Sequence, residues 1–202
     1  RNEVMAKIEL QNIAHSYNPQ AADKAYALNP FNMTWVDGGR YAILGPSGCG
    51  KTTMLNIRSG IVQPSEGKLL FNDVEVTKLS TSERNIAQVF QFPVIYGTMS
   101  VEQNLAFPLV CRNYEKAAIV AKVQEVAGAL SLEGLLKKSA SKLTADQKQL
   151  ISLGRGLVRD DVAAVLMDEP LTVIDPDLKF RLRRQLKEIN QKYRSTLIYV
   201  TH

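Results

Sequence analysis

The sequence predicts an α/β protein built on a parallel β-sheet, with a strand-rich N-terminal part and a helical insertion. A glycine-rich loop at residues 45–52 stands between an apolar strand candidate and a helix candidate. Strand-sized apolar runs then alternate with helical patterns, and between residues 101 and 158 the pattern is helical throughout. Strands that alternate with helices in this way form parallel sheets with helices on their faces.

The N-terminal part holds most of the predicted strands. Apolar and polar residues alternate in part along the first two, and the turn Asp37-Gly38-Gly39 leads into the third. One helix interrupts the strands, beginning at Thr53 and ending near Gly60. The strands predicted here are residues 8–17, 27–36, 41–44, 68–71 and 86–90.

A change of period marks the helical insertion and the return of the chain to the sheet. Two apolar stripes at helical spacing lie in the insertion: Val120, Val123, Ala127 and Leu130, and then Leu150, Leu153, Gly154 and Leu157. The elements predicted after it are a buried-type strand at residues 163–167, a helix opened by Asp175-Pro176, and a strand at residues 196–200.

The composition is that of a globular protein with one sizeable core, at 202 residues and 45% hydrophobic content. No apolar run approaches the roughly 20 residues that a membrane span needs. The net charge of +5 is mild and scattered, which does not indicate a nucleic-acid partner. Cys49 and Cys111 offer no disulfide framework and no metal-ligand spacing, which favours a reducing cytosol. The densest basic cluster is expected to be a solvated helix face: Arg181, Arg183, Arg184 and Lys187.

The glycine-rich loop fits the pattern G-x-x-x-x-G-K-[ST], a phosphate-binding loop. Its glycines let consecutive N–H groups face one anion, and the following helix adds the positive end of its dipole. Lys51 would reach the β- and γ-phosphates of a nucleotide, and the Thr52 hydroxyl would ligate Mg²⁺. The loop therefore predicts a nucleoside triphosphate and Mg²⁺ as cofactors. The predicted contacts are Gly45, Pro46, Ser47, Gly48, Cys49, Gly50, Lys51, Thr52 and Thr53.

Two adjacent carboxylates, Asp168 and Glu169, follow the predicted strand at residues 163–167. Ligands of open α/β sheets gather at the carboxyl ends of the strands. Because neighbours on a strand point to opposite faces, we expect Asp168 to hold Mg²⁺ and Glu169 to act as general base toward a water. The alternative is an ordinary surface pair.

Further residues stand in a fixed order around these motifs: Tyr17, Gln91, the stretch 143–147, the stretch 171–175 and His202. In this order they resemble the motifs of ATP-binding cassette (ABC) ATPases, the motor subunits of ABC transporters, over essentially the whole chain. The resemblance implies a single P-loop NTPase (RecA-like) domain with an N-terminal antiparallel β-subdomain and an inserted α-helical subdomain. Its parts would be residues 5–90, 92–160 and 161–202.

The resemblance also implies a role for each of these residues. Gln91 would touch Mg²⁺ or water and link the helical subdomain to a membrane partner, and His202 would contact the γ-phosphate. Tyr17 would stack on adenine, although a packing role is equally open. Asp175 would belong to the motif called the D-loop, and it can also cap the helix that begins at Pro176.

The stretch Leu143-Thr144-Ala145-Asp146-Gln147 aligns with the family signature Leu-Ser-Gly-Gly-Gln, which contacts the nucleotide held by the opposite subunit. Thr144 and Gln147 are therefore expected nucleotide contacts, and their spacing predicts a capping box. Asp146 would repel phosphate while it favours the helix start. One hypothesis is a heterodimer with an ATPase that has an intact signature; the other is a homodimer that tolerates this one.

The sequences of residues 89–94 and 100–109 resemble the corresponding segments of ATPases from carbohydrate and glycerol-3-phosphate importers. The implied partners are a second ABC ATPase, transmembrane permease subunits and, indirectly, a solute-binding protein, at the cytoplasmic side of the membrane. Such ATPases usually continue past the histidine, so we expect a chain truncated at its C-terminus. The alternatives are a soluble ABC ATPase without a transport role and a poorly hydrolysing nucleotide switch.

Overall fold

The computed structural model describes residues 7–21, 24–159, 162–170, 176–177, 179–180, 184, 187 and 196–201. The chain forms two compact units. The first unit contains residues 1–88, 161–168 and 194–202, and the second contains residues 89–160 and 169–193.

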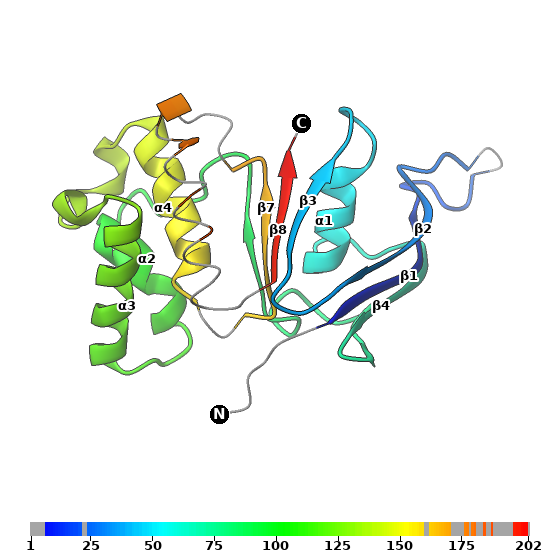
Figure 1. Cartoon of the computed structure of the whole chain (residues 1–202), viewed down its shortest axis with the longest axis horizontal. Coiled ribbons are helices and arrows are strands. Elements are labelled where there is room, and N and C mark those ends of the chain that lie inside the picture. Colours follow the sequence, from blue (N-terminus) through cyan, green and yellow to red (C-terminus); the bar gives the residue numbers. More distant parts are fainter. Residues whose placement is uncertain are drawn as a thin grey trace. The chain divides into compact units, whose positions relative to one another are not determined.

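The first unit holds an antiparallel sheet with the strand order β2-β1-β4-β5 (Figure 1). Ile8 pairs with Trp35 on one side and with Phe71 on the other, so β1 is the central strand of its three longest members. This sheet confirms the strand-rich N-terminal part, although the two-residue strand β5 was not predicted. Its strands are β1 (Ile8–His15), β2 (Leu28–Trp35), β4 (Glu66–Phe71) and β5 (Val74–Glu75).

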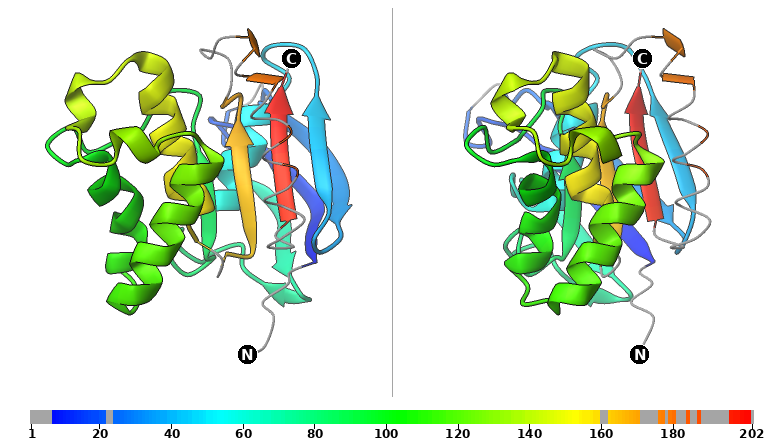
Figure 2. Two further views of the ribbon diagram at one scale, coloured as in Figure 1. Left: turned by 60° about the vertical axis from the view of Figure 1, so that its left-hand side comes forward. Right: turned by 90° about the vertical axis from the view of Figure 1, so that its left-hand side faces the viewer.

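A second sheet has the order β3-β8-β7-β6, and β8 is parallel to both β3 and β7. The arrowheads of β3, β7 and β8 point the same way in Figure 2. Every residue of β7 is buried, which explains an apolar run without alternation. The predicted α/β class with a parallel core is confirmed. The strands are β3 (Arg40–Leu44), β6 (Ile86–Val89), β7 (Ala164–Asp168) and β8 (Thr196–Thr201).

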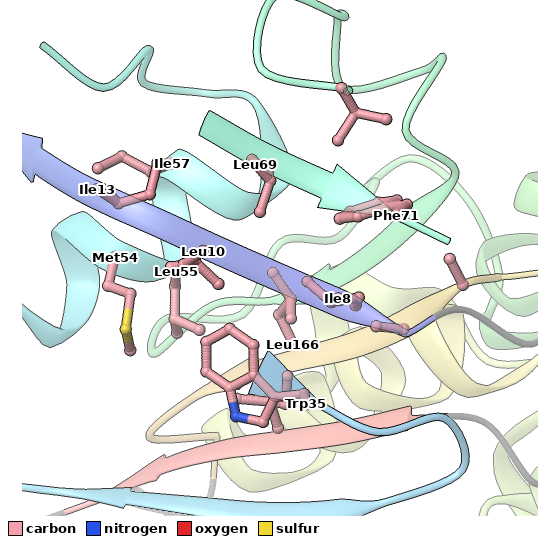
Figure 3. Close-up of a cluster of buried hydrophobic side chains, with 14 of the residues drawn as sticks. Ile8, Leu10, Ile13, Trp35, Met54, Leu55, Ile57, Leu69, Phe71 and Leu166 are labelled. Carbon is pink, nitrogen blue, oxygen red and sulfur yellow. The ribbon is translucent and has the colours of Figure 1, made fainter. Parts of the chain in front are cut away.

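Helix α1 (Lys51–Ser59) shares one apolar core with strands of both sheets. Figure 3 shows Leu10 of β1, Leu55 of α1 and Leu166 of β7 in this core, together with Trp35. All four are at most 2% exposed. Burial of each such side chain stabilises the fold by about 1.5–3 kcal/mol, so the core fixes the helix that follows the glycine-rich loop.

Two buried arginines lie at the C-terminal end of α1, one of them a residue of the helix itself. Arg84 donates to the carbonyl oxygens of Ile57 and Arg58 at this helix end, and to those of Thr77 and Leu79. Arg58 lies over the Trp35 ring, with its guanidinium carbon 4.0 Å from the ring centre. Among the described residues its guanidinium has no hydrogen-bond acceptor. Burial lowers the pKa of Arg58 to about 9.

The second unit is helical, as the period of residues 101–158 predicts. Its elements are α2 (Val101–Val110), α3 (Lys116–Ala129), the 3-10 turns η1 (Glu133–Leu135) and η2 (Ala140–Lys142), and α4 (Ala145–Leu157). A Cβ atom at Gly154 would lie 2.6 Å from Leu105 Cδ2, so a glycine lets α4 pack closely against α2. One member of the predicted stripes differs: Val120 is 56% exposed, and Val126 is buried instead.

The described residues of the segment after β7 agree with the predicted helix that begins at Pro176: Pro176, Asp177, Lys179, Phe180, Arg184 and Lys187 are helical. Arg184 and Lys187 are exposed, as a solvated basic face requires, while Arg181 and Arg183 lie outside the described residues. Within the described part of the chain, no helix combines the length and apolar character needed to cross a bilayer.

Candidate functional site

The glycine-rich loop connects the carboxyl end of β3 to the first residue of α1. Gly50 is the N-cap of α1 with a φ of 92°, and no side chain accepts a hydrogen bond there. The first turn of α1 also has no acidic residue. Because the first N–H groups of a helix lack intrahelical partners and carry the positive end of the dipole, this end of α1 offers its donors to an anion.

A glycine is required at the start of α1 for two reasons. The φ of 92° at Gly50 lies in the left-handed region that residues with a Cβ atom rarely adopt. A Cβ atom there would also lie 2.6 Å from the carbonyl oxygen of Ala27. The connection before β2, which contains Ala27, therefore lies directly against Gly50, and a residue with a Cβ atom does not fit at this position.

The Lys51 ammonium is held over the loop by the carbonyl groups of the loop itself. Its Nζ donates to the oxygens of Gly45 and Pro46 at 2.6 and 2.8 Å, and lies 3.8 Å from Cys49 Sγ. Lys51 is 8% exposed. A positive charge is thus fixed beside the free amide donors of α1, which is the arrangement that a phosphate group requires.

Tyr17 and Thr53, both predicted from the sequence as nucleotide contacts, meet in the structure. The Tyr17 hydroxyl lies 3.3 Å from Thr53 Oγ1, while 70% of the tyrosine is exposed. Most of the Tyr17 side chain is therefore open to solvent, which leaves both the stacking role and the packing role open. His15 meets the Tyr17 ring edge-on at 4.6 Å. Sequence reasoning missed His15, and the only available signal was its position two residues before Tyr17.

Asp168 lies at the same edge of the parallel sheet as the glycine-rich loop. Leu44 of β3 pairs with Thr201 of β8, and Asp168 of β7 pairs with Val200, so the three strands end together. Asp168 is 7% exposed, and Thr52 on α1 is exposed. Their oxygens are the ligand type that Mg²⁺ prefers.

These residues fit a metal that arrives with its nucleotide. Within the described residues, no group of three or more His, Cys, Asp or Glu side chains could hold a metal ion. Mg²⁺ is usually bound by one or two protein ligands together with substrate phosphates. Thr52 and Asp168 match this pattern.

Glu169 is separated from Asp168 by a backbone turn. The prediction that strand alternation separates the two carboxylates is wrong, because β7 ends at Asp168 and Glu169 has a φ of 46°. A residue with a side chain in this left-handed region stores roughly 1–2 kcal/mol of strain. Strain of this kind concentrates at functional positions.

The remaining predicted residues are distributed as follows. Gln91 is half-buried, comes two residues after β6 and belongs to the second unit, as does Glu169. Asp175 and His202 lie outside the described residues, although Thr201 ends β8 immediately before His202.

Thr144 and Gln147 form the predicted capping box at the start of α4. Thr144 Oγ1 accepts a hydrogen bond from the Gln147 amide at 3.3 Å, and the Thr144 amide donates to Gln147 Oε1 at 3.2 Å. Asp146 stands in the first turn of this helix. The start of α4 therefore uses its polar groups internally and adds a negative charge.

Comparisons with known proteins give one consistent result. The family model described as "ABC transporter" matches residues 28–172. The sn-glycerol-3-phosphate import ATP-binding protein UgpC of Escherichia coli strain K12 is 37% identical over 98% of this chain and 54% of its own length. The trehalose import ATP-binding protein SugC of Mycobacterium tuberculosis strain H37Rv is 39% identical over 98% of this chain and 49% of its own length. The chain thus spans about half the length of these curated relatives.

Solved structures agree with this match. A dimeric ATP-binding cassette in a post-hydrolysis state, bound to ADP and Pi, superposes with a TM-score of 0.84 at 25% identity, over 96% of this chain and 88% of that chain. The cbiO1 protein from Clostridium perfringens, described as part of the ABC transporter complex cbiONQ, gives a TM-score of 0.83 at 26% identity, over 96% and 78%.

Proposed function

Because the chain belongs to the ABC transporter family, we propose that it is an ATPase domain that binds Mg-ATP and drives a membrane transporter. One observation carries the proposal: the start of α1, with free amide donors and the Lys51 ammonium, lies at the same sheet edge as Asp168. A nucleotide triphosphate with its metal is the ligand that uses all three features.

Each side chain has a proposed task in hydrolysis. The amide groups of residues 45–52 and the Lys51 ammonium hold the phosphates and stabilise the charge that develops on them. Thr52 and Asp168 would hold Mg²⁺, which would neutralise negative charge on the phosphates when bound. Glu169 accepts a proton from the water that attacks the γ-phosphorus, and ADP leaves with the bridging oxygen as its bond to that phosphorus breaks. Gln91 and His202 orient that water and the γ-phosphate. Asp175, in the D-loop, is a further nucleotide contact.

The proposed cargo is a sugar or a sugar phosphate, and the direction is import. Support comes from the relatives, which are named for sn-glycerol-3-phosphate and trehalose import. The segment just after Gln91 exposes Phe92 (70%) and Val94 (51%), which is an apolar surface suited to a permease subunit. We place the chain at the cytoplasmic side of the membrane, with a solute-binding protein as an indirect partner.

The proposed second cassette is a different chain with an intact signature. The Asp146 carboxylate in the first turn makes the start of α4 a poor ligand for the phosphate of another subunit. A homodimer that tolerates this signature is the alternative. Isolation of the complex from membranes separates the two, because the first requires a second ATPase sequence in the complex.

Replacement of Glu169 by Gln tests the proposed activity. ATP binding and Mg²⁺-dependent phosphate release are measured for the wild-type chain, for Glu169→Gln and for the exposed control Glu133→Gln, in the complex isolated from membranes. We expect Glu169→Gln to retain ATP and to lose turnover by about 10²–10⁴-fold, while Glu133→Gln keeps both. Failure of the wild-type chain to bind ATP would overturn the proposal, and an unchanged rate in Glu169→Gln would remove Glu169 as the base.

A second candidate function is a nucleotide switch that hydrolyses ATP poorly. The specific observation in its favour is the altered start of α4, with Asp146 in the first turn. A switch would bind ATP but release no phosphate even within the assembled complex, and Glu169→Gln would then change nothing.

A further inference from the structure

The segment that follows β6 is fastened to helix α4 by side chains. Gln149 Nε2 donates to the Phe90 carbonyl oxygen at 3.1 Å. Ser152 Oγ accepts from the Val94 amide at 3.3 Å, and Arg155 Nη1 donates to the Val94 carbonyl at 2.5 Å. Both polar groups of the Val94 backbone are therefore bound by side chains of one helix.

The three residues of α4 form a single polar face. Residues 149, 152 and 155 are spaced by three, so they lie above one another on successive turns. Gln149 is fully buried, and Ser152 is 6% exposed. Arg155 also places its guanidinium 4.6 Å from the centre of the Tyr96 ring, a cation–π contact. We call this set the α4 ladder.

A second helix secures the far end of the same segment. Asn104 of α2 is fully buried, accepts from the Tyr96 amide at 2.8 Å and donates to the Tyr96 carbonyl at 2.9 Å. The Tyr96 ring lies 4.6 Å from the Phe107 ring, also on α2. The backbone of residues 90–96 is thus bound at both ends.

Between these fixed points the apolar side chains face outward. Phe92 and Val94 are 70% and 51% exposed although the Val94 backbone is fully bound. Such a segment presents an apolar contact surface at a fixed position relative to α4. A force applied to Phe92 or Val94 acts on α4 through the ladder, because no flexible linker separates them.

We propose that Ser152 and Arg155 are positioning residues that join residues 90–96 to α4, so that a permease segment seated on Phe92 and Val94 moves the start of α4. This inference rests on the proposed transport function. From Arg155 to Thr144 is eleven residues of one helix, or about 16 Å at 1.5 Å per residue. The ladder would thereby connect the membrane partner to the helix start that faces the second cassette.

Hydrogen exchange of single amides in the full chain tests the fastening. Ser152→Ala removes the acceptor of the Val94 amide, so we expect exchange at Val94 to accelerate at least about tenfold. The Tyr96 amide should keep its rate, because Asn104 holds it separately. Ser141→Ala, which alters an exposed hydroxyl of the same unit, serves as the control. Unchanged exchange at Val94 in Ser152→Ala would overturn the fastening.

Solute-stimulated ATP hydrolysis in the assembled transporter tests the transmission. Arg155→Lys keeps the charge but loses the planar group that stacks on Tyr96 and binds Val94. We expect the ratio of stimulated to basal rate to fall at least about fivefold in Arg155→Lys. Lys148→Ala, which removes another cation of the same helix, is the control and should keep the wild-type ratio. A purely structural role would lower the unfolding temperature and leave the ratio intact, which would overturn the transmission.

The two experiments separate this inference from the function on which it rests. If solute does not stimulate the wild-type transporter, the proposed transport function and the transmission both fail, and the exchange rate of Val94 still decides whether the ladder fastens the segment. If solute stimulates the wild type and Arg155→Lys shows the same ratio of stimulated to basal rate, the transmission is wrong while the transport function stands.

Discussion

Helices α1 and α4 begin in opposite ways. Helix α1 starts at Gly50, with no side-chain cap and no acidic residue in its first turn. Helix α4 starts at Thr144, with a complete capping box to Gln147 and with Asp146 in its first turn. The two dipoles have the same sense, so the difference lies in the cap residues, their backbone conformation and the charge of the first turn. A helix start attracts an external anion most when its own chain leaves the donors free and adds no negative charge.

The last turns of the two helices differ as well. Arg58 ends α1 in the core, over Trp35, and has no hydrogen-bond acceptor among the described residues. Arg155 ends α4 and donates to the Val94 carbonyl. One arginine is enclosed and the other joins its helix to a neighbouring segment. The predictions below change one helix at a time, from the largest expected effect to the smallest.

Removal of the Lys51 ammonium should have the largest effect on α1. Lys51→Ala deletes the charge that stands beside the free amides, and charge-assisted hydrogen bonds contribute about 1.5–3 kcal/mol each. We expect ATP affinity to fall by about 10²–10³-fold in equilibrium binding. The exposed control Lys78→Ala should bind normally, and equal affinity of Lys51→Ala and wild type would show that α1 does not hold the phosphates.

A side chain at Gly50 should damage the start of α1 itself. Gly50→Ala combines a positive φ with a contact of 2.6 Å to the Ala27 oxygen, so we expect a loss of about 2–4 kcal/mol in the free energy of unfolding. Gly48→Ala is the matched control, because its φ is 80° and a Cβ atom there meets nothing within 4 Å. Denaturant unfolding should show only about 1 kcal/mol for Gly48→Ala, and equal losses would exclude the close approach as the cause.

Replacement of Arg58 should stabilise the end of α1. Near neutral pH the arginine is charged in the folded and unfolded chain, and its burial is unfavourable, so Arg58→Met should raise the free energy of unfolding by about 1–3 kcal/mol. Above the folded pKa of about 9, the folded chain loses this proton while the unfolded chain retains it. Wild-type stability then rises relative to Arg58→Met, and the advantage of the variant should shrink.

Urea titrations at pH 7 and pH 10 measure this difference. Arg40→Met, at an exposed arginine of the same unit, should show neither effect. A destabilised Arg58→Met would mean that the contact with Trp35 outweighs the cost of burying the charge.

Removal of the Asp146 charge should have the smallest effect on stability. The carboxylate interacts favourably with the dipole of α4, so Asp146→Asn should lower the free energy of unfolding by about 0.3–1 kcal/mol. The loss should diminish in high salt, and the control Asp37→Asn should show no such salt dependence. A gain in stability would contradict the view that Asp146 serves the helix start.

Local patterns predicted the arrangement of strand, glycine-rich loop and helix, because Gly45 to Thr52 is a continuous motif with a strand before it and a helix after it. The capping box of Thr144 and Gln147 was predictable for the same reason. Contacts between distant segments were not: the sequence identified Tyr17 and Thr53 separately but not their hydrogen bond, and His15 carried no signal of its own. Arg58 is buried because Trp35 covers it, and Glu169 adopts a φ that no glutamate prefers.

The contrast between the two helix starts is tested most directly by phosphate release of the purified chain as a function of its own concentration, at saturating Mg-ATP. If α1 binds ATP and α4 cannot complete the site of a second copy, turnover per molecule stays low and constant for the wild type. Asp146→Gly should then make turnover rise with concentration. The contrast would be contradicted if turnover of the wild type already rises steeply with its concentration and depends cooperatively on ATP, and if turnover of Asp146→Gly behaves in the same way.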